Sequence, residues 1–323
     1  MSGAKGMAAV RWPDIEEARR RIAGLVHRTP VLTSSTIDAA CVGEVQFKCE
    51  NFQRTGSFKM RGAANAVSKL SPDDLSRGVC AASSGNFAQA LALAARLHGT
   101  PARIVMPEDS NPAKIEATRN YGADIVFCEP THVGRTAMTE QVQQETGAVL
   151  VHSHDDPDVI AGQGTAVCEL IEEAHDLDLI LAPVGGGGLM AGTLVAAKHL
   201  LPETRVIGCE PAGADDAARG LRAGRRIVDF VADTVADGLR TPLGENTFDI
   251  LCALIDDIVV VPEDEILSAM RYVWERMKIL IEPSSAVAVA PLLSGQIDVS
   301  GLRVGVILSG GNADLEGLLR PIG

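Results

Sequence analysis

Aromatic residues are scarce in this chain of 323 residues, since Phe, Trp and Tyr together make up only 3% of it. A fold with an aromatic-rich β core is therefore not expected, whereas the 32 glycines favour closely packed layers of helices and sheets. The sequence also lacks internal repeats, low-complexity stretches and any run of 18 apolar residues. No membrane-spanning helix and no signal peptide are expected.

Basic residues are fewer than acidic ones: the chain has 29 Lys and Arg residues and 42 Asp and Glu residues, which gives a formal net charge of -13. This balance argues against nucleic acid or an anionic membrane as a partner. The seven cysteines are scattered and form no CxxC pair. Their odd number and apolar surroundings predict reduced core thiols in a cytoplasmic protein.

The length exceeds that of one typical domain, and 46% of the residues are apolar, which is enough for a sizeable core. Between residues 77 and 154, short apolar strands alternate with helices, which is typical of parallel βαβ units. The last of these strands is expected over residues 148–154. A helix is expected over residues 12–26, with Asp14 as its N-cap, and another over residues 164–177.

The predicted fold class is α/β, with two domains whose parallel sheets are flanked by helices. Residues 78–154 are expected to form a small mobile domain. This domain is inserted in a large domain made of residues 1–77 and 155–323.

The segment NFQRTGSFKMRGA, residues 51–63, places Lys59 between Phe58 and Met60, where a predicted strand leads into a predicted helix. The positive potential of a helix start and a partly dry pocket both lower the pKa of an ammonium group. A neutral amine can form a Schiff base with an aldehyde. The alternative is a surface lysine that extends its amine into water.

A glycine loop follows the apolar strand LILAPV and precedes a helix. Its members are Gly185, Gly186, Gly187 and Gly188. Their backbone N–H groups and the helix start can bind a phosphate. Two alternatives remain open. Gly186, Gly188 and Ala191 fit the dinucleotide pattern GxGxxA, with Glu210 about 20 residues on as a ribose-binding acid. The loop could also be a tight turn between a strand and a helix.

Two further motifs help to decide which ligand the glycine loop binds. SSGN, made of Ser83, Ser84, Gly85 and Asn86, follows a strand and opens a helix, so it suits a substrate carboxylate. SGGN, residues 309–312, offers the hydroxyl of Ser309 at the carboxyl end of the last strand, where α/β sheets bind ligands. An amine, a phosphate cup and a carboxylate nest together describe an aldehyde cofactor that carries a phosphate and condenses with amino acids.

From about Arg20 to Asn312 the chain resembles the fold type II pyridoxal-phosphate enzymes, which are tryptophan synthase beta-like in fold. Within them it resembles the serine/threonine dehydratase and serine racemase family. The motifs that carry the resemblance are FQRTGSFKMRGA, SSGN, AGQGT, VGGGGL, CEPAGADD and SGGN. The resemblance implies pyridoxal 5'-phosphate as cofactor and a homodimer as the assembly.

The resemblance also implies roles for individual residues. Lys59 would hold the cofactor aldehyde as a Schiff base, with Phe58 beside the cofactor ring. Asn86 would form a hydrogen bond to the 3′-oxygen of the cofactor. The glycine loop would hold the cofactor phosphate, and Ser309 would face the pyridine nitrogen. A serine hydroxyl leaves the pyridine neutral, so the ring withdraws less charge than it would beside a carboxylate.

The predicted activity is a dehydratase, or ammonia-lyase, that converts a β-hydroxy amino acid to a 2-oxo acid and ammonia. Lys59 would act as the general base that removes the α-proton. Serine or threonine and 3-hydroxyaspartate are the candidate substrates. The alternative is a serine or aspartate racemase, in which Ser84 serves the opposite face of the substrate.

One departure from the family bears on the substrate, because Phe87 stands where the family usually has histidine. Ser83, Ser84 and Gly85 are the expected contacts to the substrate carboxylate, and Thr241 is a further hydroxyl contact. Arg135 could pair with a second carboxylate, which would favour 3-hydroxyaspartate. The alternative for Arg135 is a solvated helix face.

The segment CEPAGADD supplies the carboxylates of Glu210 and Asp216 and the backbone carbonyl of Ala214, which are hard oxygen ligands suited to Mg²⁺ or Ca²⁺. In the resembling enzymes this site holds a structural or activating divalent cation. His152 and His154 offer an alternative transition-metal site.

Overall fold

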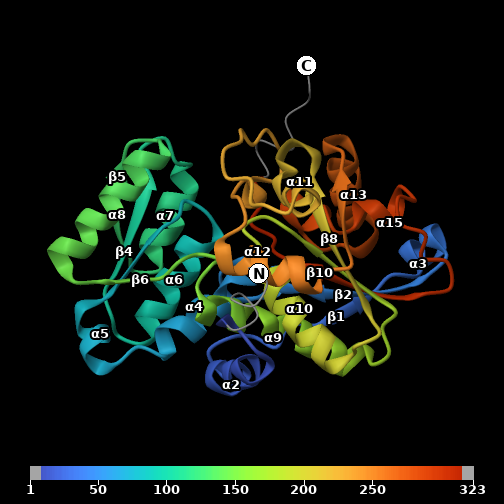
Figure 1. Ribbon diagram of the computed structural model, residues 1–323, viewed down its shortest axis with the longest axis horizontal. Helices are drawn as coiled ribbons and strands as arrows, with labels where there is room; N and C mark the ends of the chain where they lie inside the picture. Colours follow the sequence, from blue (N-terminus) through green and yellow to red (C-terminus); the bar gives the residue numbers. More distant parts are fainter. Residues whose placement is uncertain (1–8, 315–323) are drawn as a thin grey trace.

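A computed structural model describes residues 9–314 and contains two separate sheets (Figure 1). The larger sheet has six strands in the order β1-β2-β10-β7-β8-β9. They are β1 (Val31–Thr33), β2 (Glu44–Cys49), β7 (Leu179–Pro183), β8 (Arg205–Pro211), β9 (Asp257–Val261) and β10 (Arg303–Leu308). All the neighbouring pairs are parallel except β1 and β2.

Strand β1 is an antiparallel edge strand, which was not predicted, on the otherwise parallel larger sheet. Val31 pairs with Lys48, and Thr33 pairs with Gln46. Only residues 34–43 connect the two strands, and they hold the short helix α3 (Ser35–Cys41). A parallel crossover needs a dozen or more residues, so this connection returns the chain antiparallel at the edge of the sheet.

The smaller sheet has the order β5-β4-β3-β6, and all its pairs are parallel. Its strands are β3 (Val79–Ala82), β4 (Ala102–Pro107), β5 (Asp124–Cys128) and β6 (Val149–Leu150). The helices α6 (Asn86–Leu97), α7 (Pro112–Asn120) and α8 (His132–Thr146) alternate with them. The predicted α/β class and strand–helix alternation are confirmed, but β6 is shorter than the strand expected over residues 148–154. The domain boundaries and the mobility of residues 78–154 remain predictions.

Most of the remaining helices lie around the larger sheet and between the two sheets, whereas α5 lies beside the smaller sheet (Figure 1). They are α2 (Trp12–Ile22), α4 (Lys59–Ser68), α5 (Pro72–Arg77), α9 (Pro157–Ala174), α10 (Gly188–Leu200), α11 (Asp216–Ala223), α12 (Glu245–Leu254), α13 (Glu263–Met277), α14 (Pro283–Ala286) and α15 (Ala290–Leu293). Four 3₁₀ turns, η1 (Glu50–Phe52), η2 (Arg54–Gly56), η3 (Ala212–Ala214) and η4 (Asp237–Leu239), lie in the loops. Within residues 9–314, no helix is long and apolar enough to cross a membrane.

Two of the predicted helix boundaries were wrong. The helix expected over residues 12–26 ends at Ile22, and Asp14 lies at its third position, where its carboxylate accepts the backbone N–H of Arg11 at 2.8 Å. The helix expected from residue 164 already begins at Pro157. The carboxylate of Asp156 caps that earlier start by accepting the N–H groups of Asp158 and Val159.

Glycine allows α4, α9 and α10 to pack closely. A Cβ atom on Gly192 of α10 would lie 2.5 Å from the backbone nitrogen of Gly164 in α9. A Cβ atom on Gly162 would lie 2.6 Å from the Cα atom of Gly62 in α4. This close packing confirms the expectation from composition. Each of the seven cysteines is a free thiol; six are buried, and Cys252 is exposed.

Candidate active site

The carboxyl ends of β2, β7 and β10 lie at one edge of the larger sheet, and they are followed by the Lys59 segment, the glycine loop and the SGGN motif, respectively. The segment after β2 and the segment after β10 pair with each other. Phe58 N–H donates to the carbonyl of Ser309 at 3.0 Å, and Gly311 N–H donates to the carbonyl of Gly56 at 2.9 Å. The structure thus brings the Lys59 segment and the SGGN motif together, although about 250 residues separate them.

Lys59 is the first residue of α4. Its amine donates a hydrogen bond to the carbonyl of Ser153 at 3.0 Å. The same amine lies 5.0 Å from the ring centroid of Phe58 and 5.8 Å from that of Phe87. Burial lowers the pKa of Lys59 to about 8, and the charge of Glu282 opposes this shift. A substantial fraction of the amine is therefore neutral near physiological pH, as Schiff-base chemistry requires.

The turn before Lys59 is strained. Thr55 has φ 60° and ψ 12°, a left-handed conformation that is uncommon for a residue other than glycine. Asn312 supports this turn by donating from its side-chain amide to the carbonyl of Thr55 at 2.7 Å. The hydroxyls of Thr55 and Ser57 are buried without a protein partner. Unsatisfied buried hydroxyls beside Lys59 are what a missing polar ligand would leave.

The glycine loop lies between β7 and α10 and is packed from both sides. A Cβ atom on Gly185 would lie 2.8 Å from the Cα atom of Leu239, and one on Gly188 would lie 2.8 Å from the carbonyl oxygen of His154. Gly186 faces the ring of His154, and Gly187 has φ 86°. No side chain would fit at these positions, so the loop offers bare backbone N–H groups at the start of α10.

Asn86 begins α6 and reaches across to the larger sheet. Its side-chain amide donates to the two carboxylate oxygens of Glu282 at 2.9 and 3.2 Å. Its carbonyl oxygen accepts from the side chain of Asn312 at 2.8 Å. The hydrogen bond between Asn86 and Asn312 thus connects the motifs SSGN and SGGN directly, and Glu282 accepts a hydrogen bond from Asn86 at the same place. Ser83, Ser84 and Gly85 lie half-buried in the loop before α6, while Phe87 is buried.

Ser309 is 2% exposed, and its hydroxyl lies 3.1 Å from that of Ser285. Ser285 Oγ in turn accepts the N–H of Gly310 at 2.7 Å and lies 2.8 Å from the Gly310 carbonyl, to which it can donate. Ser285 therefore fixes the position of the serine that is expected at the pyridine nitrogen. Sequence reasoning missed both Ser285 and Glu282. The only signal was a single acid and two serines at the start of the apolar stretch IEPSSAVAVA.

Two predicted substrate contacts lie on exposed surface. Arg135 is exposed on α8, and Thr241 is exposed shortly after η4. No contact to a substrate can be assigned to either residue, and their roles remain predictions. The side chain of Glu282, which was not predicted, is the acid that lies nearest to Asn86.

The predicted cation ligands lie together at the end of β8. Glu210 accepts the N–H groups of Ala217 and Ala218 at 2.8 and 2.9 Å. Burial raises the pKa of Glu210 to about 8 and that of Asp216, the first residue of α11, to about 7. Ala214 is in the adjoining turn η3. Buried carboxylates with raised pKa values beside a backbone carbonyl suit a hard divalent cation, which would neutralise them.

The histidine alternative gains no support. His152 and His154 meet edge to face with ring centroids 4.5 Å apart. Among residues 9–314, no group of three or more His, Cys, Asp or Glu side chains could hold a metal. Burial instead lowers the pKa of His154 well below its ordinary value, so its ring is a neutral packing surface for the glycine loop.

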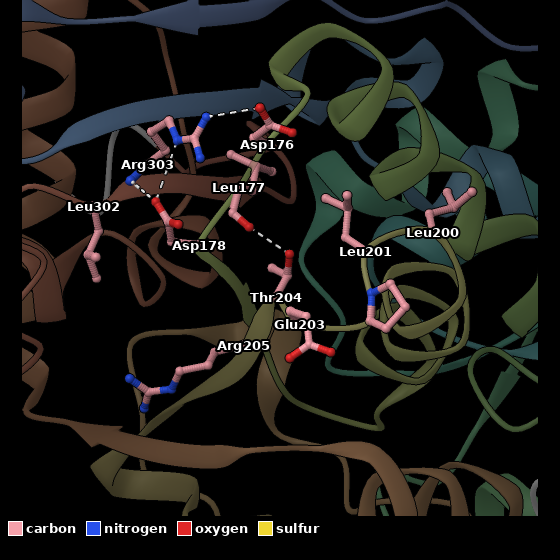
Figure 2. A pocket seen from close by; sticks show the side chains of 11 residues that line it. Asp176, Leu177, Asp178, Leu200, Leu201, Glu203, Thr204, Arg205, Leu302 and Arg303 are labelled. Carbon is pink, nitrogen blue, oxygen red and sulfur yellow. Dashed lines mark hydrogen bonds and ion pairs between the residues drawn. The ribbon is translucent and has the colours of Figure 1, made fainter.

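A surface cavity of about 480 Å³ lies at the opposite edge of the larger sheet, where β7, β8 and β10 begin (Figure 2). Several of its polar groups bond one another. Thr204 donates to the carbonyl of Leu177 at 2.6 Å, and Asp178 accepts the N–H of Arg303 at 2.8 Å. Because none of the predicted motifs reaches this edge, the cavity is separate from the candidate active site.

The residues at the carboxyl edge fit pyridoxal 5′-phosphate. A buried amine of lowered pKa suits its aldehyde, glycines too crowded for any side chain suit its phosphate, and the hydroxyl of Ser309 suits its ring nitrogen. A dinucleotide fits less well. Glu210, the expected ribose-binding acid, is buried and already accepts two N–H groups from α11.

Comparison with known proteins agrees with this assignment. Residues 22–310 match the family model described as pyridoxal-phosphate dependent enzyme. The serine racemase of Dictyostelium discoideum is 46% identical over 316 residues, which are 97% of this chain and 98% of that protein. Its crystal structure matches with a TM-score of 0.91 over 95% of this chain and all of that one. The beta-hydroxyaspartate dehydratase of Paracoccus denitrificans is 44% identical over 95% of this chain and 98% of that protein.

A third relative is also named for 3-hydroxyaspartate. The L-threo-3-hydroxyaspartate ammonia-lyase of Saccharomyces cerevisiae is 43% identical over 311 residues, which are 96% of this chain and 95% of that protein. With a family match over most of its length and relatives above 40% identity along nearly all of it, the chain belongs to the pyridoxal-phosphate dependent enzymes of fold type II.

Proposed function

We propose that this enzyme is an ammonia-lyase that converts a β-hydroxy amino acid into a 2-oxo acid and ammonia. One observation carries the proposal. The amine of Lys59, whose pKa is lowered to about 8, lies between two aromatic rings at the point where the glycine loop and the SSGN and SGGN motifs converge. An amine in such a place can both hold an aldehyde and take a proton from a bound amino acid.

Each part of the site has a role in this reaction. The bound cofactor supplies an aldehyde that condenses with amines and a ring that accepts the electrons of the Cα–H bond. The glycine loop at residues 185–188 would hold its phosphate, and Asn86 and Ser309 would orient its ring. Lys59 Nζ would remove the α-proton, and the β-hydroxyl would leave together with a proton as water. Hydrolysis of the resulting unsaturated amino acid would then release ammonia and the 2-oxo acid. The rings of Phe58 and Phe87 limit the access of water to the amine.

The substrate we favour is 3-hydroxyaspartate. Two relatives at 43 and 44% identity carry the names L-threo-3-hydroxyaspartate ammonia-lyase and beta-hydroxyaspartate dehydratase. Phe87 offers no hydrogen bond to a substrate carboxylate, so recognition of serine alone would be weak. Arg135 can supply a bidentate partner for a second carboxylate if α8 approaches the bound substrate.

A racemase is the second candidate. Relatives named serine racemase reach 46% identity, and Ser84 lies half-buried in the loop that precedes α6. A hydroxyl in this loop could return a proton to the face opposite Lys59. The two activities give different products, because a racemase returns an amino acid of inverted configuration and an ammonia-lyase gives a 2-oxo acid.

We further propose a divalent cation site, a homodimer and a mobile small domain. Glu210, Ala214 and Asp216 hold Mg²⁺ or Ca²⁺, because their donor set is hard and their buried carboxylates need a counter-charge. The enzyme works as a cytoplasmic homodimer. Residues 78–154 move as a small domain against residues 1–77 and 155–323.

The deciding experiment incubates the cofactor-loaded enzyme with L-serine, D-serine, L-threonine and the stereoisomers of 3-hydroxyaspartate, one at a time. Release of 2-oxo acid and ammonia is measured together with the configuration of the recovered amino acid. We expect 2-oxo acid at the highest rate from one isomer of 3-hydroxyaspartate. Inverted amino acid without ammonia would establish the racemase instead, and no conversion of any of them would overturn the proposal.

A further inference from the structure

Glu282 is a buried acid beneath the two glycines of the SGGN motif. Only 3% of it is exposed, and its backbone N–H donates to the carbonyl of Gly310 at 3.1 Å. A Cβ atom on Gly310 would lie 2.7 Å from the carboxylate oxygen Oε1. Glycine at position 310 therefore makes room for this carboxylate, and the carboxylate has little freedom to move away.

The side-chain amide of Asn86 is held from two directions. Its nitrogen donates to Glu282, and its oxygen accepts from Asn312 at 2.8 Å. If the amide were flipped, its oxygen would face a carboxylate and its nitrogen would face another N–H donor, so the orientation is fixed by chemistry. An amide nitrogen carries two protons. Glu282 takes one of them, which leaves the other for a ligand.

We propose that Glu282 is a positioning residue that fixes the amide of Asn86 so that its second N–H is presented to the ring oxygen of the cofactor. This inference rests on the proposed role of Asn86 in holding the cofactor. It assigns a further residue to the site, one that acts through Asn86 and touches neither substrate nor the reacting atoms.

The charges around Glu282 are consistent with this role. Burial raises the pKa of Glu282 to about 7, and the charge of Asp237 in η4 adds to this effect, while the amide of Asn86 and the charge of Lys114 in α7 oppose it. Lys59 in α4 also senses the carboxylate. A carboxylate accepts a hydrogen bond more strongly than a neutral group does, so its charge sets how firmly Asn86 is held.

The test measures the dissociation constant of pyridoxal phosphate from the apoprotein by absorbance titration for Asn86→Ala, Glu282→Gln and the double variant. Glu282→Gln is nearly isosteric and is expected to weaken binding about 3- to 10-fold, because a charge-assisted hydrogen bond becomes a neutral one. If Glu282 acts through Asn86, the double variant binds no more weakly than Asn86→Ala. Additive losses would overturn the proposal.

Asp237→Asn is the matched control, since it removes a nearby negative charge and an exposed ion pair with Lys114 but leaves the contact between Glu282 and Asn86 in place. We expect it to leave the dissociation constant within about twofold of the wild type, as for an exposed charge. A loss as large as that of Glu282→Gln would mean that net charge, not the contact with Asn86, matters, and would overturn the proposal.

A charge swap separates positioning from a purely structural role. Asn86→Asp alone places two buried carboxylates against each other and is expected to lower the melting temperature. Adding Glu282→Gln restores the contact with reversed polarity, so the melting temperature should recover. The cofactor affinity should not recover, because the side chain at position 86 then has no N–H to donate. Recovery of affinity, or no recovery of stability, would contradict the inference. None of these measurements uses a substrate, so they stand apart from the test of the ammonia-lyase activity.

Discussion

Arg61 and Glu50 form an ion pair from which solvent is excluded at both side chains, and the guanidinium donates to the two carboxylate oxygens at 2.7 Å each. Arg61 also bonds Glu169 of α9 at 2.8 Å, and Lys48 of β2 pairs with the same Glu169 at 2.6 Å. Because Arg61 lies two residues after Lys59, this network anchors the start of α4 to the larger sheet and to α9.

Replacement of Arg61 by Met is expected to destabilise the protein by about 3–5 kcal/mol, because it leaves the buried carboxylate of Glu50 without a counter-charge and with only the hydroxyl of Thr29 as a donor. Chemical denaturation of the purified variant measures the free energy of unfolding. Arg20→Gln is the control, since it removes an exposed pair with Glu16 and should cost less than about 1 kcal/mol. An equal loss in the free energy of unfolding in the two variants would show that the buried network stabilises the protein no more than an exposed ion pair does.

Replacement of Lys59 by Ala should abolish covalent attachment of the cofactor. Borohydride reduction followed by mass spectrometry of the peptide that holds residue 59 should show the added mass in the wild type only. The rate of attachment should rise with pH with a midpoint near pH 8 and then level off, because half of the amine is neutral at its lowered pKa of about 8 and nearly all of it is neutral above that value. A rate that rises up to about pH 10, as for an ordinary lysine, would contradict the structure.

Replacement of Phe87 by His should improve the binding of plain serine. An imidazole N–H beside the substrate carboxylate adds one hydrogen bond, which is expected to lower KM for serine by about 3- to 10-fold. Phe87→Leu is the control, because it removes the ring without adding a donor and should not lower KM. If both variants lower KM equally, the cause is the smaller side chain at position 87 and not an added hydrogen bond.

The acids Glu210 and Asp216 should make stability depend on both pH and a divalent cation. Their folded pKa values, about 8 and about 7, lie above those of free carboxyl groups. Without a cation, their contribution to stability is complete at low pH and is lost as the pH rises through these values. In a chelator, the melting temperature should therefore fall between about pH 5 and about pH 8.

Added Mg²⁺ or Ca²⁺ should raise the melting temperature more at the higher pH, where both acids can ionise. Glu210→Gln is expected to remove this response. An equal gain at both pH values, or a gain that persists in Glu210→Gln, would mean that the cation binds elsewhere.

The ion pair between Lys114 of α7 and Asp237 of η4 links the smaller sheet layer to the larger one. It joins residues 78–154 to the rest of the chain. Lys114→Met should speed hydrogen exchange in α7, because the pair contributes up to about 1 kcal/mol to the docked arrangement. Lys69→Met, which breaks a pair with Asp158 outside residues 78–154, should leave α7 unchanged. If exchange in α7 is unaltered by Lys114→Met, the pair does not hold the layers together.

Local patterns predicted much of this structure. The alternation of strands and helices, the glycine loop before α10 and the start of a helix beside Lys59 all follow from residues that are neighbours in the sequence. Strand β1 was missed because three residues carry too little pattern, and its direction depends on a short connection and not on its composition.

Long-range contacts explain what the sequence could not predict at the site. Glu282 contacts Asn86 across 196 positions, and Ser285 contacts Ser309 across 24. Nothing in the local sequence of either residue indicates these partners. Thr55 would ordinarily be assigned a right-handed or extended conformation, and its positive φ depends on support from Asn312 near the other end of the chain.

The segment that follows β6 contacts both Lys59 and the glycine loop. The carbonyl of Ser153 holds the amine of Lys59, and the next residue, His154, forms the wall of the glycine loop. This segment is also where the chain passes from the smaller sheet to α9. It is therefore fixed to the amine of Lys59 and to the glycine loop at once. If the small domain moves as proposed above, a rotation about this segment would keep those two groups in register while it carried the SSGN loop towards or away from them.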